Sequence, residues 1–117
     1  MKYKNKKLYI ENLPIEKLAK KYDTPLYCYS LNKIKDNITN FKNNFKSINP
    51  IICFSVKSNS NIHLLKIIKK MGLGADVVSK GELLKVLKVG MHPKKIVFSG
   101  VGKDYDELNL AIKKKFY

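Results

Sequence analysis

Arginine is absent from this chain of 117 residues, and all 24 of its basic residues are lysine. Only 9 residues are acidic, which gives a formal net charge of +15 at pH 7. Such an excess of positive charge is typical of proteins that bind nucleic acid. Yet the lysines are scattered along the whole chain, and the missing arginine is the residue best suited to phosphates and guanine edges. We therefore expect a solvated lysine surface and predict no nucleic-acid partner.

Long apolar segments are missing as well. No apolar h-region follows the basic N-terminus, so we expect no signal peptide. No apolar run approaches the roughly 18 residues of a membrane span.

Cysteine is limited to Cys28 and Cys53, and each lies within an expected strand, which favours reduced core residues over metal ligands or a disulfide. We therefore predict a cytoplasmic protein without a membrane partner or a metal.

The first 50 residues predict short elements that are separated by breaks. Residues 8–13 are expected to form a short strand or extended lead-in, and a helix follows over residues 14–22, with proline in its first turn. Thr24-Pro25 ends this helix, and residues 26–29 are expected to form the next strand. Ser30 then caps a longer helix. Its apolar residues, spaced three and four apart, predict one buried face: Leu31, Ile34, Ile38, Phe41 and Phe45.

From residue 51 onward a β–α unit repeats. The expected strands are residues 51–56, 74–78 and 96–99, and the expected helices are residues 61–71, 80–89 and a third from about residue 105. The strand starts are 23 and 22 residues apart. Ser79 and Glu82 have the spacing of a capping box at the start of the second helix, and Asp104 with Glu107 repeats it before the third. This alternation of strand and helix predicts a parallel sheet.

A parallel sheet of this kind closes either as an open doubly wound sheet or as a barrel. An open sheet commonly has a glycine-rich turn after its first strand, but Ser30-Leu31-Asn32 follows the expected strand 26–29. We therefore predict an α/β fold whose parallel (β/α) units form the first part of a TIM-type (β/α)8 barrel. Such a barrel needs about 250 residues, so we expect it to be incomplete in this chain. Residues 1–24 are expected to be a lead-in, and residues 25–117 the first units of the barrel.

Lys57 follows the apolar run 51–56, at the end of an expected strand where a barrel places its active site. An amine there is suited to forming a Schiff base. Asp76 lies in the next expected strand and Glu82 one turn into the helix beyond, so both carboxylates could hold the amine and transfer protons. Alternatively, Lys57 is a surface lysine, Asp76 caps a helix and Glu82 is only the capping partner of Ser79. We expect His63 and His92 to be structural or solvated.

Four segments carry a resemblance to a known family. Residues 54–61 (Phe-Ser-Val-Lys-Ser-Asn-Ser-Asn) resemble the lysine motif of the fold-type III pyridoxal-phosphate decarboxylases. Residues 72–83 are similar to the segment that follows in the diaminopimelate decarboxylase family, and residues 22–30 and 96–103 are similar to that family's opening segment and next strand. The resemblance runs from about residue 8 to the end of the chain. It departs from the family pattern at three positions: Asp23 and Lys80, where glycine is usual, and Asp104, where threonine is usual.

The resemblance implies that Lys57 binds pyridoxal 5'-phosphate as a Schiff base, with Asp76, and with less support Glu82, close to that lysine. It implies decarboxylation of an amino acid, meso-diaminopimelate, to L-lysine in lysine biosynthesis by a homodimeric enzyme. The phosphate-binding and substrate-binding residues are implied to lie beyond this chain, so we expect the chain to be an N-terminal fragment that is inactive alone. Two alternatives remain: another fold-type III enzyme (an ornithine- or arginine-type decarboxylase or an amino-acid racemase), or a truncated, non-catalytic lysine-rich binding protein.

Overall fold

The computed structural model describes residues 1–114. The chain divides into two compact units, Met1–Asn44 and Phe45–Tyr117. This boundary reflects packing within the chain. The predicted division, between a lead-in of residues 1–24 and a barrel region of residues 25–117, lies earlier in the sequence and stays a prediction. The last three residues of that barrel region, 115–117, lie outside the described residues.

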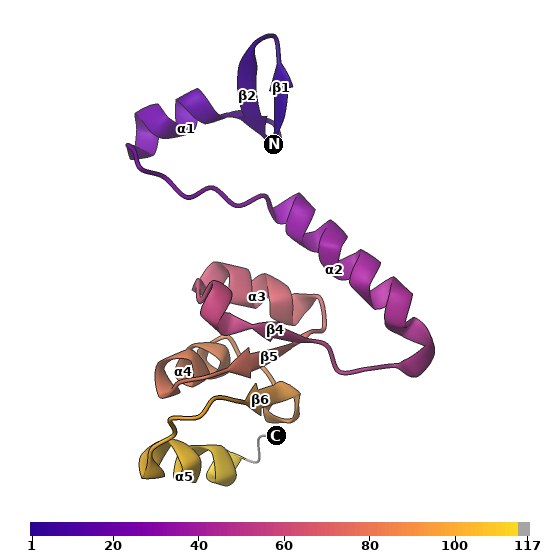
Figure 1. Ribbon diagram of the computed structural model, residues 1–117, viewed down its shortest axis with the longest axis vertical. Coiled ribbons are helices and arrows are strands. Elements are labelled where there is room, and N and C mark those ends of the chain that lie inside the picture. The colour runs from indigo at the N-terminus through magenta and orange to yellow at the C-terminus, as the bar shows by residue number, and fades with distance from the viewer. Residues whose placement is uncertain (115–117) are drawn as a thin grey trace. The chain divides into compact units, whose positions relative to one another are not determined.

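The first unit begins with a small antiparallel sheet whose strands are β1 (Lys2–Lys4), β2 (Lys7–Ile10) and β3 (Leu13–Pro14), in that order (Figure 1). Asn5 and Lys6 join β1 to β2 with φ values of 47° and 63°. Positive φ at both positions is the mark of a type I′ turn, one of the two turns favoured in two-residue hairpins. The expected lead-in at residues 8–13 is thus divided between β2 and β3, and β1 was not predicted.

Helix α1 (Ile15–Tyr22) follows directly, with Pro14 at its N-cap instead of in its first turn. The helix ends at Asp23, whose φ is 67°. Glycine adopts such a φ without steric cost, which explains why the diaminopimelate decarboxylase family, as the resemblance implies, usually has glycine at this position. Aspartate tolerates it here because its Oδ1 accepts a hydrogen bond from the Thr24 N–H at 2.9 Å.

The expected strand at residues 26–29 is wrong for this structure, since residues 26–30 have no regular secondary structure. A strand is stabilised by hydrogen bonds to a neighbouring strand, and no described strand pairs with this segment. The expected helix is present as α2 (Leu31–Phe45), and Ser30 Oγ accepts a hydrogen bond from the Lys33 N–H at 3.1 Å. Its apolar face is not buried as predicted, because none of its residues is buried.

The second unit contains the predicted repeat. Its elements are β4 (Cys53–Ser55), the 3-10 turn η2 (Val56–Ser58), α3 (Ile62–Lys70), β5 (Gly74–Val77), α4 (Lys80–Lys88), β6 (Ile96–Phe98) and α5 (Tyr105–Lys114), with short 3-10 turns at Lys46–Ile48 and Pro93–Lys95. The three strands are parallel and adjacent in the order β4-β5-β6. The structure confirms the predicted α/β class and its parallel β/α units.

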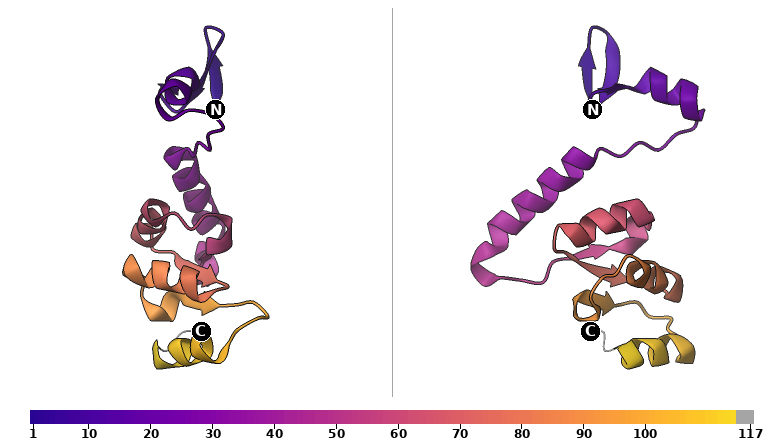
Figure 2. Two further views of the ribbon diagram at one scale, coloured as in Figure 1. Left: turned by 90° about the vertical axis from the view of Figure 1, so that its left-hand side faces the viewer. Right: turned by 180° about the vertical axis from the view of Figure 1, so that it is seen from behind.

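The core of the second unit lies between one face of this sheet and the helices that follow the strands. Ala75, Val77 and Ile96 are fully buried, as are Leu65 of α3 and Leu83 of α4. Figure 2 shows the same strands and helices from the side and from behind. The opposite face of the sheet carries the alternate strand residues, and it is this face that holds the polar side chains of the candidate site.

Helix ends in the second unit follow the local chemistry of the sequence. Gly72 and Gly90 adopt φ values of 81° and 75° just after α3 and α4, a conformation that ends many helices. Asp104 Oδ1 accepts from the Glu107 N–H at 2.7 Å, while Glu107 Oε2 accepts from the Asp104 N–H at 3.3 Å. The predicted capping box before α5 is confirmed, and aspartate supplies the cap where the family usually has threonine.

Candidate functional site

The carboxyl ends of the three parallel strands bring chemically useful side chains to one edge of the sheet. Ser55 of β4 is in register with Asp76 of β5, and Asp76 is in register with Val97 of β6. Lys57 follows β4 by two residues, and Ser99 comes directly after β6. In a parallel α/β fold, ligands bind at this edge because the loops beyond the strands surround it.

Lys57 lies in the 3-10 turn η2 and not at the end of a strand that runs to residue 56 as predicted, because β4 ends at Ser55. Two hydrogen bonds close the turn: the Ser58 hydroxyl donates to the Ser55 carbonyl at 2.7 Å, and the Asn59 N–H donates to the Val56 carbonyl at 3.1 Å. The Lys57 side chain is exposed. Its amine has no hydrogen bond or ion pair with any described residue.

Asp76 projects from the middle strand and is half-buried. Its Oδ1 accepts a hydrogen bond from the Ser99 hydroxyl at 2.5 Å. This contact argues against the alternative in which Asp76 caps a helix, since α4 is capped by Ser79. The sequence predicts Ser99 only as the end of the strand 96–99 and does not connect it to Asp76, because the two residues lie 23 positions apart and the register of β5 and β6 joins them.

The Cys53 thiol occupies the same face as Asp76. Burial raises the pKa of this thiol, and the negative charge of Asp76 raises it further. Gly74 lies directly opposite Cys53 in the register, and a Cβ on this glycine would lie 2.9 Å from the Cys53 Sγ and 2.2 Å from the Lys95 carbonyl oxygen. The strands thus approach closely beside the candidate site, and only glycine fits there.

Glu82 serves as a helix cap in this structure. Its Oε2 accepts a hydrogen bond from the Val78 N–H at 2.9 Å, and its own N–H donates to Ser79 Oγ at 3.3 Å. The capping box predicted from the sequence therefore forms, with the carboxylate reaching one residue further back than the N-cap. No described hydrogen bond links Glu82 to Lys57 or Asp76, so its proposed place near the cofactor rests on the resemblance alone.

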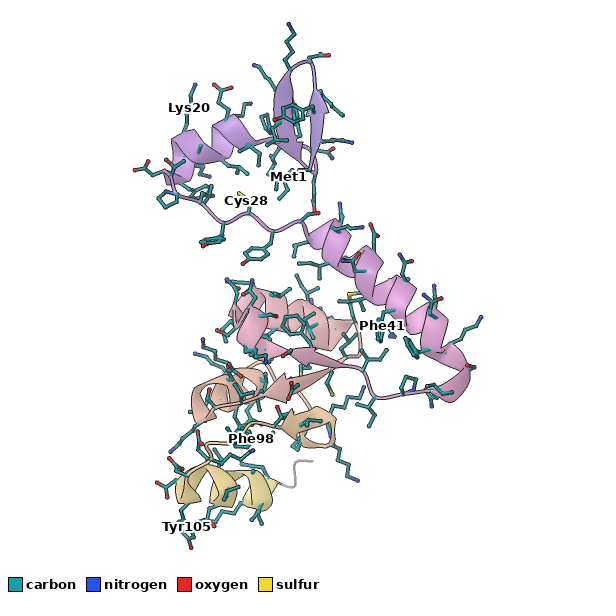
Figure 3. All side chains as sticks on the ribbon, in the orientation of Figure 1. Met1, Lys20, Cys28, Phe41, Phe98 and Tyr105 are labelled. Carbon is teal, nitrogen blue, oxygen red and sulfur yellow. The ribbon has the colours of Figure 1, made fainter. Side chains whose placement is uncertain are left out.

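The loop between β6 and α5 is tied to its surroundings by two side chains. The Lys103 amine donates to the Gly100 carbonyl at 2.5 Å and lies 5.2 Å from the centre of the Phe98 ring. Glu107 Oε1 accepts from the Lys80 N–H at 2.7 Å and so connects the start of α5 to the start of α4. Figure 3 labels Phe98 and Tyr105, which mark the end of β6 and the start of α5 on either side of this loop.

The two histidines lie outside the candidate site. His92 is the N-cap of a 3-10 turn, where its Nδ1 accepts a hydrogen bond from the Lys94 N–H at 3.2 Å. His63 lies in the first turn of α3, and its backbone N–H donates a hydrogen bond to Asn61 Oδ1 at 2.9 Å. Within residues 1–114, no group of three or more His, Cys, Asp or Glu side chains is placed to hold a metal ion.

Both cysteines are free thiols. None of the described helices combines the length and the apolar character needed to cross a membrane.

The residues at this edge of the sheet fit an aldehyde cofactor such as pyridoxal phosphate. Condensation with an aldehyde requires a primary amine that is accessible and not engaged elsewhere, and the Lys57 amine is both exposed and without a described partner. The neighbouring strand carries a carboxylate, Asp76, in register with Ser55, two residues before Lys57. Ser99 holds one oxygen of this carboxylate, which leaves the other oxygen without a described donor.

Comparison with known proteins identifies the family to which such a site belongs. The family described as pyridoxal-dependent decarboxylase, pyridoxal binding domain, matches residues 31–116. Diaminopimelate decarboxylase from Haemophilus influenzae is 44% identical over 110 residues, which cover 94% of this chain and 26% of that protein. The chain thus spans about a quarter of the length of this relative.

Two solved structures have the same fold over most of the chain. Diaminopimelate decarboxylase from M. jannaschii in co-complex with L-lysine is 32% identical, with a TM-score of 0.93 over 98% of this chain and 28% of that one. The enzyme from Helicobacter pylori complexed with L-lysine is 41% identical, with a TM-score of 0.81 over 87% of this chain and 26% of that one. These matches confirm the predicted fold class, in which the parallel β/α units are the N-terminal part of a TIM-type barrel.

Proposed function

The chain belongs to the pyridoxal-dependent decarboxylase family, in its pyridoxal-binding domain, and from this premise we propose that the intact protein to which these residues belong converts meso-diaminopimelate to L-lysine with pyridoxal 5'-phosphate bound to Lys57. The observation that carries the proposal is the exposed Lys57 amine, without a described partner, at the carboxyl edge of the parallel sheet. Within this proposal, residues 25–117 form the first units of the barrel, and residues 1–24 lead into it.

The chain's own residues would act as follows. The Lys57 amine would hold the cofactor covalently by condensing with its aldehyde group, with loss of water. Asp76, on the neighbouring strand, would hold the proton that the Lys57 Nζ gives up and return it to that nitrogen. Pyridoxal phosphate, when bound, supplies the electron sink that accepts the electron pair left behind as carbon dioxide departs. Glu82 is proposed only as a second carboxylate nearby, held by its bond to the Val78 N–H.

The choice of substrate is supported by the relatives. The relatives described above are diaminopimelate decarboxylases, and two of their structures contain L-lysine, the product of the proposed reaction. An ornithine- or arginine-type decarboxylase or an amino-acid racemase is the competing proposal, because the same amine would serve all of these reactions. A homodimer with a small amino-acid substrate, in the cytoplasm, is the expected state of the intact protein.

Borohydride reduction in the presence of pyridoxal phosphate tests the role of Lys57. The intact protein should carry one reduced cofactor on the peptide that contains Lys57, a gain equal to the cofactor mass less one oxygen, and Lys57→Ala should lose this label and at least about a thousandfold of the activity. Lys66→Ala is the matched control, since Lys66 is an exposed lysine on α3. Label that remains in Lys57→Ala, or label found equally on Lys66 in the unaltered protein, would show that the cofactor site is misassigned.

Product analysis tests the substrate. With meso-diaminopimelate the intact protein should release L-lysine and carbon dioxide, whereas ornithine and arginine should yield neither putrescine nor agmatine at a comparable rate. Release of putrescine or agmatine, or racemisation without loss of carbon dioxide, would favour the competing members of the family and leave the Lys57 assignment intact.

A further inference from the structure

The hydroxyl of Ser99, which comes directly after β6, forms a side-chain hydrogen bond with Asp76 of β5 at the candidate site. Asp76 belongs to β5, where its neighbours Ala75 and Val77 are fully buried on the opposite face. The backbone at Asp76 is therefore held firmly, while the carboxylate itself can still rotate about its side-chain bonds. A second contact is needed to fix the direction in which the carboxylate points.

Ser99 supplies that contact from the adjacent strand. Its N–H donates to the Val77 carbonyl at 2.9 Å, which continues the pairing of β5 and β6 one residue beyond β6. Its hydroxyl donates to Oδ1 of Asp76 at 2.5 Å. Ser99 is thus anchored by its own backbone while it holds the side chain of its neighbour, so the position of Oδ1 is determined by the sheet.

The remaining oxygen of Asp76 is left available. No described residue donates a hydrogen bond to Oδ2. The charge of Asp76 also acts on β4, the strand that leads to Lys57, since it contributes to the raised pKa of Cys53 there. The register pairs Asp76 with Ser55 of β4, two residues before Lys57, so this carboxylate, held by one oxygen, lies on the strand next to the turn that carries the amine.

We propose that Ser99 is a positioning residue, whose hydroxyl holds Oδ1 of Asp76 so that the free Oδ2 takes up the proton of the Lys57 amine as that amine binds the cofactor. The inference rests on the proposed function and adds a residue to it. The Lys57 nitrogen must lose a proton before its electron pair can form the bond to the aldehyde carbon, and the Asp76 carboxylate is the acceptor of this proton. When the hydroxyl is absent the carboxylate rotates, and proton transfer becomes slower.

A double-mutant cycle on the intact protein, freed of cofactor, tests this role. The measured quantity is the rate at which pyridoxal phosphate becomes attached to Lys57, trapped by borohydride and located by peptide mass. Ser99→Val and Ser99→Thr have side chains of the same shape, and only threonine keeps the hydroxyl. We expect Ser99→Val to slow attachment about tenfold, as for the loss of one hydrogen bond to a charged group, and Ser99→Thr to restore most of the rate.

The coupling to Asp76 separates positioning from a merely structural role. Asp76→Asn should slow attachment by at least as much as Ser99→Val, and the double variant should be no slower than Asp76→Asn alone. Equal rates in Ser99→Val and Ser99→Thr, or a further independent loss in the double variant, would overturn the inference. Hydrogen exchange of the β5 peptide identifies any variant that has lost the sheet. If Ser99→Val has lost it, the test rests on Ser99→Thr, which keeps the hydroxyl and should attach the cofactor at close to the rate of the unaltered protein.

The proposed function fails in a different way from this inference. If the unaltered protein does not attach pyridoxal phosphate to Lys57 at all, the proposed function and the inference are both wrong. If it does attach the cofactor, and the two Ser99 variants are indistinguishable, only the role of Ser99 is wrong.

Discussion

The two compact units of this chain bury their apolar residues to very different extents. Of the 14 buried apolar residues among residues 1–114, all but Ile10 lie in the second unit, where helices cover one face of a parallel sheet. In the first unit, apolar side chains line an open pocket of about 430 Å³, and Leu13, Tyr22 and Tyr27 are more than half exposed. The unit that carries the candidate site therefore has a core of its own.

The first unit relies instead on polar contacts between its elements. Glu11, at the turn between β2 and β3, accepts hydrogen bonds from the Ser30 hydroxyl and the Asn32 N–H, each at 2.8 Å. These bonds tie the small sheet to the start of α2, and they hold the pKa of the Glu11 carboxyl below its usual value. The difference between the units teaches that the hydrophobic effect shapes the site-bearing region, whereas local turns and polar bonds shape the region before it.

Matched leucine substitutions give the largest expected contrast between the units. Leu65→Ala removes a fully buried side chain from α3 and should cost about 2–5 kcal/mol of stability. Leu13→Ala removes a side chain that is 55% exposed and should change stability by about 0.5 kcal/mol or less. Urea unfolding of the intact protein, with hydrogen exchange of the α3 and β3 peptides, measures both effects. Equal losses in the two variants would contradict the comparison.

A pair of glycine substitutions tests how tightly the second unit is packed beside the site. Gly74→Ala brings a Cβ to 2.2 Å from the Lys95 carbonyl oxygen, so β5 and β6 must shift, at a cost of about 1–3 kcal/mol. Gly81→Ala is the control, since the nearest atom to its added Cβ is Ser79 Oγ at 4.0 Å, and because Gly81 lies in α4 the change should leave stability unaltered or raise it by up to about 1 kcal/mol. Thermal unfolding of both variants measures the difference. A neutral Gly74→Ala would show that the strands are less closely packed than described.

The polar bonds of Glu11 predict a smaller, pH-dependent effect in the first unit. The pKa of this carboxyl is lower in the folded chain than its usual 4.5. Its hydrogen bonds therefore contribute fully to the stability of the first unit above that pH, and this contribution is lost as the pH falls through the lowered pKa. Hydrogen-exchange protection of the Asn32 and Lys33 amides should therefore decrease in acid, and Glu11→Gln should reduce it already at neutral pH. Glu16→Gln, which alters an exposed pair with Lys20, is the control and should leave these amides unchanged. Protection that stays constant from neutral to acid pH would show that Glu11 does not hold α2.

Local signals in the sequence were sufficient for most elements of the second unit. The apolar runs, the glycines after α3 and α4, and the capping boxes at Ser79 and Asp104 all act within a few residues, so each element forms largely where its own residues favour it. The strict alternation of these elements then allows few arrangements other than a parallel sheet. The fold class of residues 51–114 was predictable for this reason.

Predictions that depended on a distant partner were less successful. Residues 26–29 have the composition of a strand, yet no described strand pairs with them, and strand propensity alone does not form a strand. The apolar residues of α2 have helical spacing, and the helix forms, but its face is not buried. Periodicity reports which face of a helix could be buried, and only the neighbouring elements decide whether it is.

By itself, the sequence determined the β/α order of the second unit, the position of Lys57 beyond a strand and the family to which the chain belongs. Only the tertiary structure decided that Lys57 lies in a 3-10 turn, that Glu82 caps α4 and that Ser99 holds Asp76. Backbone propensities act over a few residues and can be read in order along the chain. The Ser99–Asp76 contact joins residues 23 positions apart, and it exists because parallel pairing of β5 and β6 sets their register.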